Sequence, residues 1–382
     1  MQASKLLAWS LKKNGIRDVF FYPGACLLPI AYSLEDCGIR KITMRSDASI
    51  PHACNGFFQA SGKVAVGFAG AGPAFTNLLT GLAAAKADGI PMVIFVANME
   101  KAVIGAGGFQ DFEMCKAAVP FVKKAFFARD GSSFACTVQA AFAACTSGRP
   151  GPVLVEVPRD VWVEEVDVFD LKFEQMFFSE KILSLSQLEN SSVSNALSLC
   201  TAFFDCVVTG NGLHKYVAMQ SFCGKKLISS DSFGCMGFSL PAAIGACIAL
   251  KEQVFLFVGD GDFNMCSNEL GTILQYGLPL KIVVFNNSSF GSINQLRREN
   301  CRPVEKFANP DFELIARAYG LDYLDAEEST LPQCIKRACS SLTPCLIDFR
   351  CELSVLEGIP LLRKWLNENR IKPLATISIA VG

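Results

Sequence analysis

Two apolar runs separated by one helical stretch constrain the fold of this chain more than any other feature. VFLFV (residues 254–258) and LKIVVF (residues 280–285) are short and continuous, and the stretch between them, at about residues 267–276, has helical spacing. Two buried strands joined through a helix form a right-handed βαβ unit, in which the strands are parallel. The sequence therefore predicts an α/β fold built on parallel sheets.

Polar residues follow each of these strands directly. Asp260 lies between two glycines after the first run, and Asn287 closes a pair of asparagines after the second. Parallel neighbours lie about 4.8 Å apart, so we expect both side chains at the carboxyl edge of the sheet, where ligands of α/β folds bind. A carboxylate and an amide oxygen suit Mg²⁺. Gly259 and Gly261 permit close approach of a phosphate beside a helix N-terminus. We expect Mg²⁺ and a diphosphate here.

Composition narrows the class of protein. The chain has 382 residues, 51% of them hydrophobic, which is enough for two domains of ordinary size. A net charge of −1 without a basic block argues against a nucleic-acid partner or an anionic membrane surface. The long uncharged runs at residues 64–85 and 232–250 contain glycines and a proline, so we expect buried strand–loop–helix segments and no membrane partner.

Cysteine usage and the N-terminus bear on location. The 17 cysteines include no CxxC pair and there are only 2 histidines, so neither a disulfide framework nor a zinc site is expected. The N-terminal MQASKLLAWSLKKNG has early lysines and no cleavable apolar core. We expect a cytoplasmic protein with reduced cysteines.

Strand and helix signals divide the chain into two α/β blocks. The first block covers residues 1–165 and the second residues 196–350. Residues 166–195 are charged, Ser-rich and short of strand signals, so they are predicted to form a linker with at most one helix. Residues 351–382 are predicted to be a tail, with a candidate helix around residues 359–367. The expected strands are DVFFYP, KITMRS, KVAVGFAG, PMVIFVAN and PVLVEVP in the first block, and FDCVVTGN, VFLFV, LKIVVF and CLIDFR in the second.

The motifs in these blocks resemble thiamine-diphosphate-dependent enzymes, and in particular the acetolactate synthase group. The first block carries DVFFYPGACLLPI, RSDASIPHACNGFFQASGK, GFAGAGPAFTNLLTGLAAAKADGIPMVIFVAN, GGFQDFE and RPGPVLVEVPRDV. The second carries VTGNGLHKYVAMQ, SFGCMGFSLPAAIGA and the segment from GDG to NN. The resemblance implies a pyrimidine-binding domain followed by a diphosphate-binding domain.

The same resemblance assigns roles to individual residues. It implies Mg²⁺ ligands at Asp260, Asn287 and the Ser289 carbonyl. Met236 resembles the apolar residue that wedges thiamine diphosphate into its bent form, although a methionine can also simply fill a gap in a core. Ile293 would add an apolar contact, or would serve ordinary packing. The implied diphosphate contacts are Gly212, His214, Gly259, Gly261 and the backbone amide of Asp262.

Three residues of the first block are implied to approach the cofactor from the other domain. They are Gly24, Gln110 and Asp47, and Gln110 can also be interpreted as an exposed loop residue. Asp47 stands where the family commonly has Glu, whose carboxylate hydrogen-bonds N1′ of the pyrimidine. The alternative is that Asp47 caps a helix beginning near Ser49.

Asp262 is a second departure from the family, which has Ser at this position. A like charge 4 Å from a diphosphate costs about 4 kcal/mol at an effective dielectric constant near 20. We therefore expect the Asp262 side chain to turn outward, to reach the metal, or to weaken cofactor binding. These departures keep a non-catalytic, cofactor-binding paralogue open as an alternative.

The spacing between the blocks bears on the reaction. About 35 residues lie between Val161 and Ala196, too few for the middle domain, with its flavin site, of full-length acetolactate synthases. Compact sulfopyruvate and phosphonopyruvate decarboxylases also lack that domain, and the loop SSFGSINQLRR resembles theirs. We expect decarboxylation of a small 2-oxo acid, with carboligation as the alternative, in a homodimer or tetramer.

Arg297 and Arg298 would attract an anionic substrate tail, or form a solvated pair. A nicotinamide site at GFAGAG is disfavoured, because Pro73 follows and no acidic residue ends a strand about 20 positions later.

Overall fold

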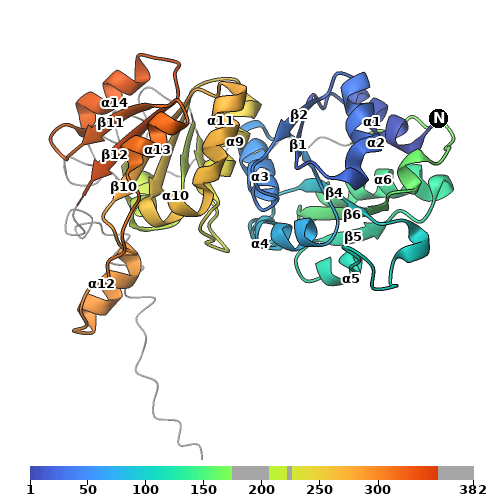
Figure 1. The fold of residues 1–382 in the computed structure, drawn as a ribbon, viewed down its shortest axis with the longest axis horizontal. Helices are drawn as coiled ribbons and strands as arrows, with labels where there is room; N and C mark the ends of the chain where they lie inside the picture. Colours follow the sequence, from blue (N-terminus) through green and yellow to red (C-terminus); the bar gives the residue numbers. More distant parts are fainter. Residues whose placement is uncertain (174–205, 222–225, 352–382) are drawn as a thin grey trace, which may run out of the picture.

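The structure is a computed structural model that describes residues 1–173, 206–221 and 226–351. It contains two α/β domains that lie side by side, each built on a six-stranded sheet of parallel strands (Figure 1). β6 ends at Pro158 and β7 begins at Cys206, and no middle domain is evident among the described residues. The predicted fold class is therefore confirmed.

The first sheet has the order β2-β1-β3-β4-β6-β5. Its central strands are fully buried, as is usual for parallel strands that carry helices on both faces. The strands are β1 (Asp18–Phe21), β2 (Arg40–Thr43), β3 (Ala65–Ala69), β4 (Met92–Asn98), β5 (Lys124–Phe127) and β6 (Pro152–Pro158).

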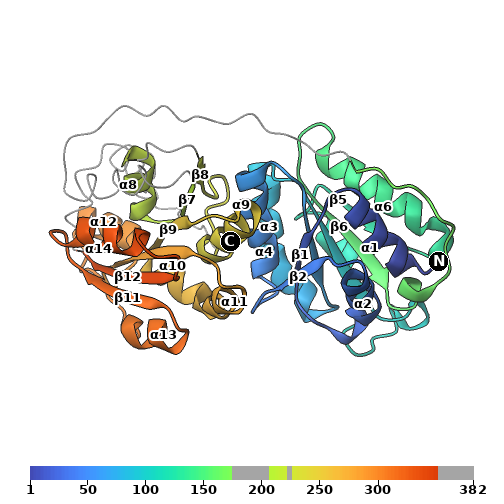
Figure 2. The same cartoon turned by 90° about the horizontal axis from the view of Figure 1, so that it is seen from above.

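Successive residues of each strand point to opposite faces, so the helices form two layers on this sheet. Phe21 and Phe68 pack with one layer, whereas Phe20 and Ile94 pack with the other. The first layer contains α1 (Ala3–Lys13), α2 (Leu28–Asp36) and α6 (Gly131–Thr146). The second contains α3 (Ser49–Ser61), α4 (Pro73–Asp88) and α5 (Met114–Ala118), and it faces the second domain (Figure 2).

The second sheet has the order β11-β12-β10-β9-β7-β8. Its strands are β7 (Cys206–Thr209), β8 (Lys226–Ile228), β9 (Val254–Gly259), β10 (Leu280–Asn286), β11 (Asp322–Ala326) and β12 (Cys345–Arg350). Its helices are α8 (Leu213–Ser221), α9 (Ser239–Leu250), α10 (Asp260–Cys266), α11 (Leu270–Tyr276), α12 (Gly291–Glu299), α13 (Phe312–Ala318) and α14 (Leu331–Cys339).

All nine expected strands are present, and the three that the apolar pattern misses, β5, β8 and β11, are edge strands. Edge strands are half exposed, so they lack a continuous apolar run. The helix expected at about residues 267–276 begins earlier, at Asp260, as α10. A short 3-10 turn, Ser267–Glu269, separates α10 from α11. Asp260 and Asp262 lie in the first turn of α10, where the helix dipole favours acidic residues.

The segment expected to be the linker lies mostly outside the described residues, as do the candidate helix at residues 359–367 and the rest of the tail. Its described part, residues 166–173, packs on the first domain, where Val166, Leu171 and Phe173 are buried. Among the described helices, none combines the length and the apolar character that a membrane crossing requires. No disulfide bond joins the cysteines that the structure describes.

The two domains meet where α3 crosses α9. A Cβ atom on Gly56 would lie 2.0 Å from the Ala242 carbonyl oxygen, and one on Gly245 would lie 2.0 Å from the Ala53 carbonyl oxygen. Glycine at both positions therefore allows the two backbones to touch, and a side chain would force the helices apart.

A buried carboxylate fixes the connection between β2 and α3 against the second domain. Glu269 is fully buried and accepts hydrogen bonds from the Arg45 amide, at 3.0 Å, and from the Ser46 amide, at 3.1 Å. The segment that leads into Asp47 is thereby held against the second domain.

His52 is a buried titratable side chain at this interface. It lies on α3, is buried, and meets the Phe238 ring edge-on at 5.6 Å. Burial lowers its pKa to about 4. The folded state therefore favours the neutral imidazole. The stability that this preference contributes is present above about pH 6.5 and is lost as the pH falls toward 4.

We expect His52→Gln to flatten the acid side of the stability profile. One pKa unit corresponds to about 1.4 kcal/mol. Between pH 7.5 and pH 4.5 the free energy of unfolding should therefore fall by about 2 kcal/mol less in His52→Gln than in wild type. Urea unfolding at both pH values measures this. Equal losses in the two proteins would show that His52 is not buried in its neutral form.

Candidate functional site

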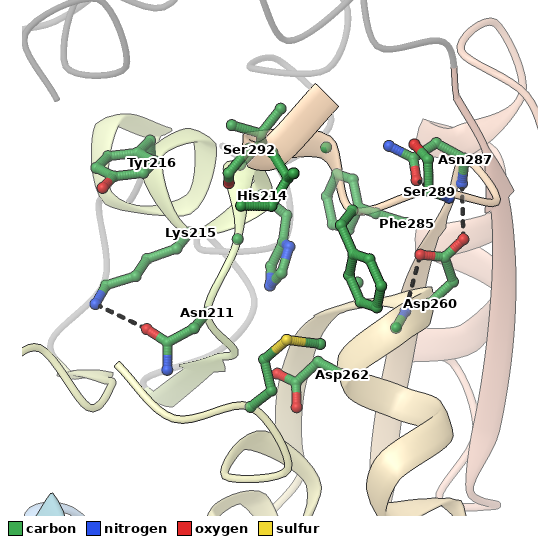
Figure 3. Close-up of a pocket in the computed structure, with 18 of the residues that line it drawn as sticks. Asn211, His214, Lys215, Tyr216, Asp260, Asp262, Phe285, Asn287, Ser289 and Ser292 are labelled. Carbon is green, nitrogen blue, oxygen red and sulfur yellow. Dashed lines mark hydrogen bonds between the residues drawn. The ribbon is translucent and has the colours of Figure 1, made fainter. Parts of the chain in front are cut away.

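A cavity of about 360 Å³ lies at the carboxyl edge of the second sheet (Figure 3). It is bounded by the residues that follow β7, β9 and β10 and by the first turns of α8, α10 and α12. The expected residues that line it are Gly212, His214, Met236, Gly259, Asp260, Gly261, Asp262, Asn287, Ser289 and Ile293. The topology thus brings together ten residues that are spread over 82 positions of sequence, from 212 to 293.

Three glycines shape the floor of the cavity. A Cβ atom on Gly212 would lie 2.8 Å from the His214 ring, and one on Gly259 would lie 3.2 Å from the same ring. A Cβ atom on Gly261 would lie 2.8 Å from the Phe290 ring. A side chain at any of these positions would crowd the ring of His214 or Phe290, so glycine leaves the backbone open toward the cavity.

Asp260 is held by donors on both carboxylate oxygens. Oδ1 accepts from the Gly261 amide at 2.9 Å, and Oδ2 accepts from the amides of Ser288, at 2.6 Å, and Asn287, at 3.2 Å. Burial raises the pKa of this carboxyl, and these hydrogen bonds, with one from Asn309, oppose the rise. The carboxylate is thereby fixed at the junction of β9 and β10.

Asn287 and Ser289 complete the oxygen set expected for a metal. The Asn287 side-chain oxygen accepts from the Ser289 amide at 3.0 Å, and both residues line the cavity with Asp260. Among the described residues there is no group of three or more His, Cys, Asp or Glu side chains arranged to hold a metal. One carboxylate, one amide oxygen and one carbonyl fit Mg²⁺, which keeps several water or phosphate ligands.

His214 is a buried polar side chain that lies beside two of these glycines, Gly212 and Gly259. It stacks on Phe285 with ring centroids 5.5 Å apart. Burial, and secondarily the charge on Lys215, lowers its pKa to about 3. Its Nε2 atom is buried and has no hydrogen-bond partner among the described residues. This imidazole can donate to a diphosphate oxygen through Nε2 only when Nε2 carries the ring proton, so its role as a diphosphate contact stays a prediction.

Met236 and Ile293 both contribute apolar surface to the cavity. The Met236 Cε atom lies 3.3 Å from the position of a Gly261 Cβ, whereas Ile293 on α12 is 52% exposed. Met236 therefore lies against the backbone of Gly261 at the cavity, and its role as a wedge stays a prediction, as does the role of Ile293.

The Asp262 side chain does not turn outward, which corrects one of the three outcomes expected for it. Its side chain is 1% exposed, and Oδ1 accepts from the Gly237 amide at 2.5 Å. The carboxylate points beneath the loop that carries Met236. Packing around Gly210 and Gly237 provides a place for it that the sequence pattern did not reveal.

Gly24, Asp47 and Gln110 do not line this cavity. They gather around the turn after β3 and the helix that follows it: Gly24 lies against Gly70, and Gln110 lies against Gly72. Gln110 has a positive φ of 57°, an uncommon conformation outside glycine that tends to occur at functional sites.

Asp47 is buried beside α4. Its Oδ2 atom accepts from the Asn77 side chain at 3.3 Å, and Oδ1 is buried without a partner among the described residues. Burial raises its pKa. The alternative that Asp47 caps a helix is wrong, because Ala48 is the N-cap residue of α3 and no side-chain cap hydrogen bond is present.

Sequence reasoning missed a layer of side chains behind Asp260. Asn309 donates to Asp260 Oδ2 at 2.8 Å and to the Asn286 side-chain oxygen at 2.9 Å. Asn286 in turn donates to Asp348 at 2.9 Å. Asn309 lies in an irregular segment before α13, where no strand or helix pattern marks it. Sequence reasoning also missed Lys215, which lines the cavity and forms an ion pair with Asp231 at 2.5 Å.

We expect Asn309→Ala to weaken Mg²⁺ binding by about 10- to 100-fold, as is common when a residue that orients a metal ligand is removed. Titration of Mg²⁺ in the presence of thiamine diphosphate measures this. Asn264→Ala is the matched control, because Asn264 contacts the Asn309 oxygen at 2.9 Å and not Asp260, and it should cost only a few-fold. An unchanged Mg²⁺ affinity in Asn309→Ala would contradict the orienting role.

Comparison with known proteins agrees with this geometry. The family model "Thiamine pyrophosphate enzyme, N-terminal TPP binding domain" matches residues 1–117, and "Thiamine pyrophosphate enzyme, C-terminal TPP binding domain" matches residues 210–349. The second match contains the whole cavity.

Curated relatives carry the name acetolactate synthase large subunit. The protein from Pyropia yezoensis is 35% identical, over 82% of this chain and 85% of its own length. The protein from Lactococcus lactis subsp. lactis is 23% identical, over 84% and 87%. The protein from Porphyra purpurea is 30% identical over 60% of this chain, and the match spans only 42% of that protein. The chain therefore belongs to the thiamine pyrophosphate enzymes and, within them, to the acetolactate synthase group.

Proposed function

We propose that this protein binds thiamine diphosphate with Mg²⁺ and decarboxylates a small 2-oxo acid. One observation carries the proposal: Asp260, Asn287 and the glycines around them meet with Met236 in a single cavity. The family membership supports the same cofactor.

Each residue has a proposed task in holding the cofactor. Asp260, Asn287 and the Ser289 carbonyl would bind Mg²⁺, and Gly212, Gly259, Gly261, His214 and the Asp262 amide would contact the diphosphate. Met236 would support the bent conformation, with Ile293 covering the outer side. When bound, thiamine diphosphate supplies a nucleophilic carbon and an electron sink for decarboxylation.

The first domain would supply the proton chemistry. We propose that Asp47 holds a proton shared with the pyrimidine N1′ atom, which its burial and unpartnered Oδ1 favour. Gly24 and Gln110 would approach the pyrimidine and the substrate from the same edge of the first sheet.

Carboligation is the second candidate, and the names of the curated relatives favour it. In that reaction a second carbonyl compound, instead of a proton, accepts the carbon left by decarboxylation. The shorter carboxylate at Asp47 favours a third alternative, a cofactor-binding protein without turnover.

One incubation separates these candidates. The purified protein is mixed with thiamine diphosphate, Mg²⁺ and a panel of 2-oxo acids, and CO₂, aldehyde and condensed product are measured, with Asp260→Ala as the blank. CO₂ with aldehyde supports the decarboxylase, and CO₂ with condensed product supports the carboligase. Cofactor binding without CO₂ from any acid would overturn both.

We also propose a homodimer, or a tetramer of two dimers, in which each site is shared between chains, as in the family. Apolar side chains on the outer face of the first domain support an interface there: Leu28 and Tyr32 lie one turn apart on α2 and are 46% and 57% exposed. Sedimentation should give at least twice the 41.3 kDa of one chain. An active monomer would contradict the proposal.

A further inference from the structure

The Asp262 carboxylate occupies a position that no part of the proposed cofactor chemistry requires. It is buried, it follows the proposed metal ligand Asp260 by two residues, and it accepts a hydrogen bond at 2.5 Å from the Gly237 amide. Gly237 directly follows Met236. The carboxylate therefore acts on the backbone beside the residue proposed to support the bent cofactor.

Gly210 leaves the space that this carboxylate fills. A Cβ atom on Gly210 would lie 2.0 Å from Asp262 Oδ2 and 3.1 Å from Ser239 Cβ. Gly210 has no positive φ, so glycine is needed here for space and not for backbone conformation. The sequence thus contains a matched pair, a buried carboxylate and a glycine that makes room for it.

The other side of Met236 is anchored as well. Asn211, which follows Gly210, donates from its side chain to the Cys235 carbonyl at 2.8 Å. Cys235 and Gly237 are the two neighbours of Met236, and each is held by a side chain from a different element. Gly237 has a φ of 82° and lies against Met265, so its backbone is also confined by packing.

We propose that Asp262 is a positioning residue that holds the Met236 loop in place and thereby shapes the part of the cavity that receives the rings of thiamine diphosphate. This inference rests on the proposed cofactor. If Asp262 only repelled a diphosphate, its loss would tighten binding of both ligands. If it positions the Met236 loop, its loss should weaken binding of the complete cofactor and leave binding of the diphosphate alone unchanged.

The test compares two ligands, Mg²⁺–thiamine diphosphate and Mg²⁺–pyrophosphate, by calorimetry. We expect Asp262→Ala to bind thiamine diphosphate about tenfold more weakly, the effect of one lost hydrogen bond of ordinary strength, and to bind pyrophosphate as wild type does. Asp262→Asn keeps a side-chain oxygen that can accept from the Gly237 amide, so it should bind thiamine diphosphate more tightly than Asp262→Ala does. Tighter binding of both ligands by Asp262→Ala, or unchanged binding of both, would overturn the inference.

Gly210→Ala is an independent test of the same contact, because this variant keeps Asp262. The added methyl group should displace the carboxylate and reproduce the tenfold loss in the wild-type background. In the Asp262→Ala background it should cost less, because the 2.0 Å clash with the carboxylate is then gone and only the 3.1 Å contact with Ser239 Cβ remains. Additive losses in this double-mutant cycle would contradict the contact.

Amide hydrogen exchange of the protein without cofactor separates this inference from the proposed function. Exchange at Gly237 should be faster in Asp262→Ala and in Gly210→Ala than in wild type, and unchanged in Asp262→Asn. If wild type binds neither ligand, the proposed function fails, and the exchange rates still decide whether Asp262 holds the loop. Equal exchange at Gly237 in all four proteins would overturn the positioning role.

Discussion

Replacement of Asp260 with alanine is expected to weaken Mg²⁺-dependent binding of thiamine diphosphate by more than about 100-fold. Asp260 is the one carboxylate in the proposed metal set, and its partners there, Asn287 and the Ser289 carbonyl, are neutral. Loss of one member of a buried charged contact commonly costs about 3 kcal/mol or more, which corresponds to that factor. The variant also leaves the Ser288 amide, now bonded to Asp260 at 2.6 Å, without its acceptor.

Calorimetric titration of thiamine diphosphate, with and without Mg²⁺, measures this effect. Asp311→Ala is the matched control, since Asp311 caps α13 in the same domain by accepting from the Leu314 amide at 3.0 Å. That variant should lose about 1 kcal/mol of stability and none of the cofactor affinity. If Asp260→Ala binds the cofactor as wild type does, the metal assignment is wrong.

Replacement of Asp47 is expected to give the second large effect, on activation of the cofactor. A carboxylate that shares a proton with N1′ contributes on the order of 100-fold or more to proton transfer, so Asp47→Ala should slow exchange of the C2 proton of thiamine diphosphate by at least about that factor. Asp47→Glu should accelerate exchange. Glu is longer by one methylene, and a misplacement of about 1 Å can cost on the order of 100-fold.

Proton NMR of acid-quenched samples measures exchange at C2 directly. Asp18→Ala is the control, because Asp18 lies on β1 of the same domain and pairs with Arg40 at 2.6 Å, away from Asn77 and α4. Exchange in Asp47→Ala as fast as in wild type would show that Asp47 does not activate the cofactor. Faster exchange in Asp47→Glu would identify the natural protein as a slowed or specialised member of its family.

The interior of both sheets was predictable from local patterns. β9 and β10 are continuous apolar runs, and a right-handed βαβ connection leaves them one parallel arrangement, in which Phe285 pairs with Gly259. Asp260 and Asn287 follow directly from that register, because each lies immediately beyond a strand. Their meeting therefore depends on a unit of about 30 residues, which sequence periodicity describes well.

The edges of the sheets and the support of the site were not predictable in this way. β11 lies at an edge and alternates between buried and exposed residues, so its apolar signal is weak. Asn309 reaches Asp260 from a segment without regular structure, 49 positions further along the chain. No periodicity relates two such residues, and only the folded arrangement brings them into contact.

Asp262 and Asp47 illustrate the same limit for single side chains. Charge alone predicted that Asp262 would turn outward, reach the metal or weaken cofactor binding, whereas its direction depends on the space left by Gly210 and on the hydrogen bond from the Gly237 amide. The position of Asp47 beside Asn77 depends on how α3 and α4 pack. Strand order and the polar residues at strand ends follow from patterns along the chain. The direction of a buried side chain depends on steric and hydrogen-bonding neighbours from other elements, which become neighbours only when the chain folds.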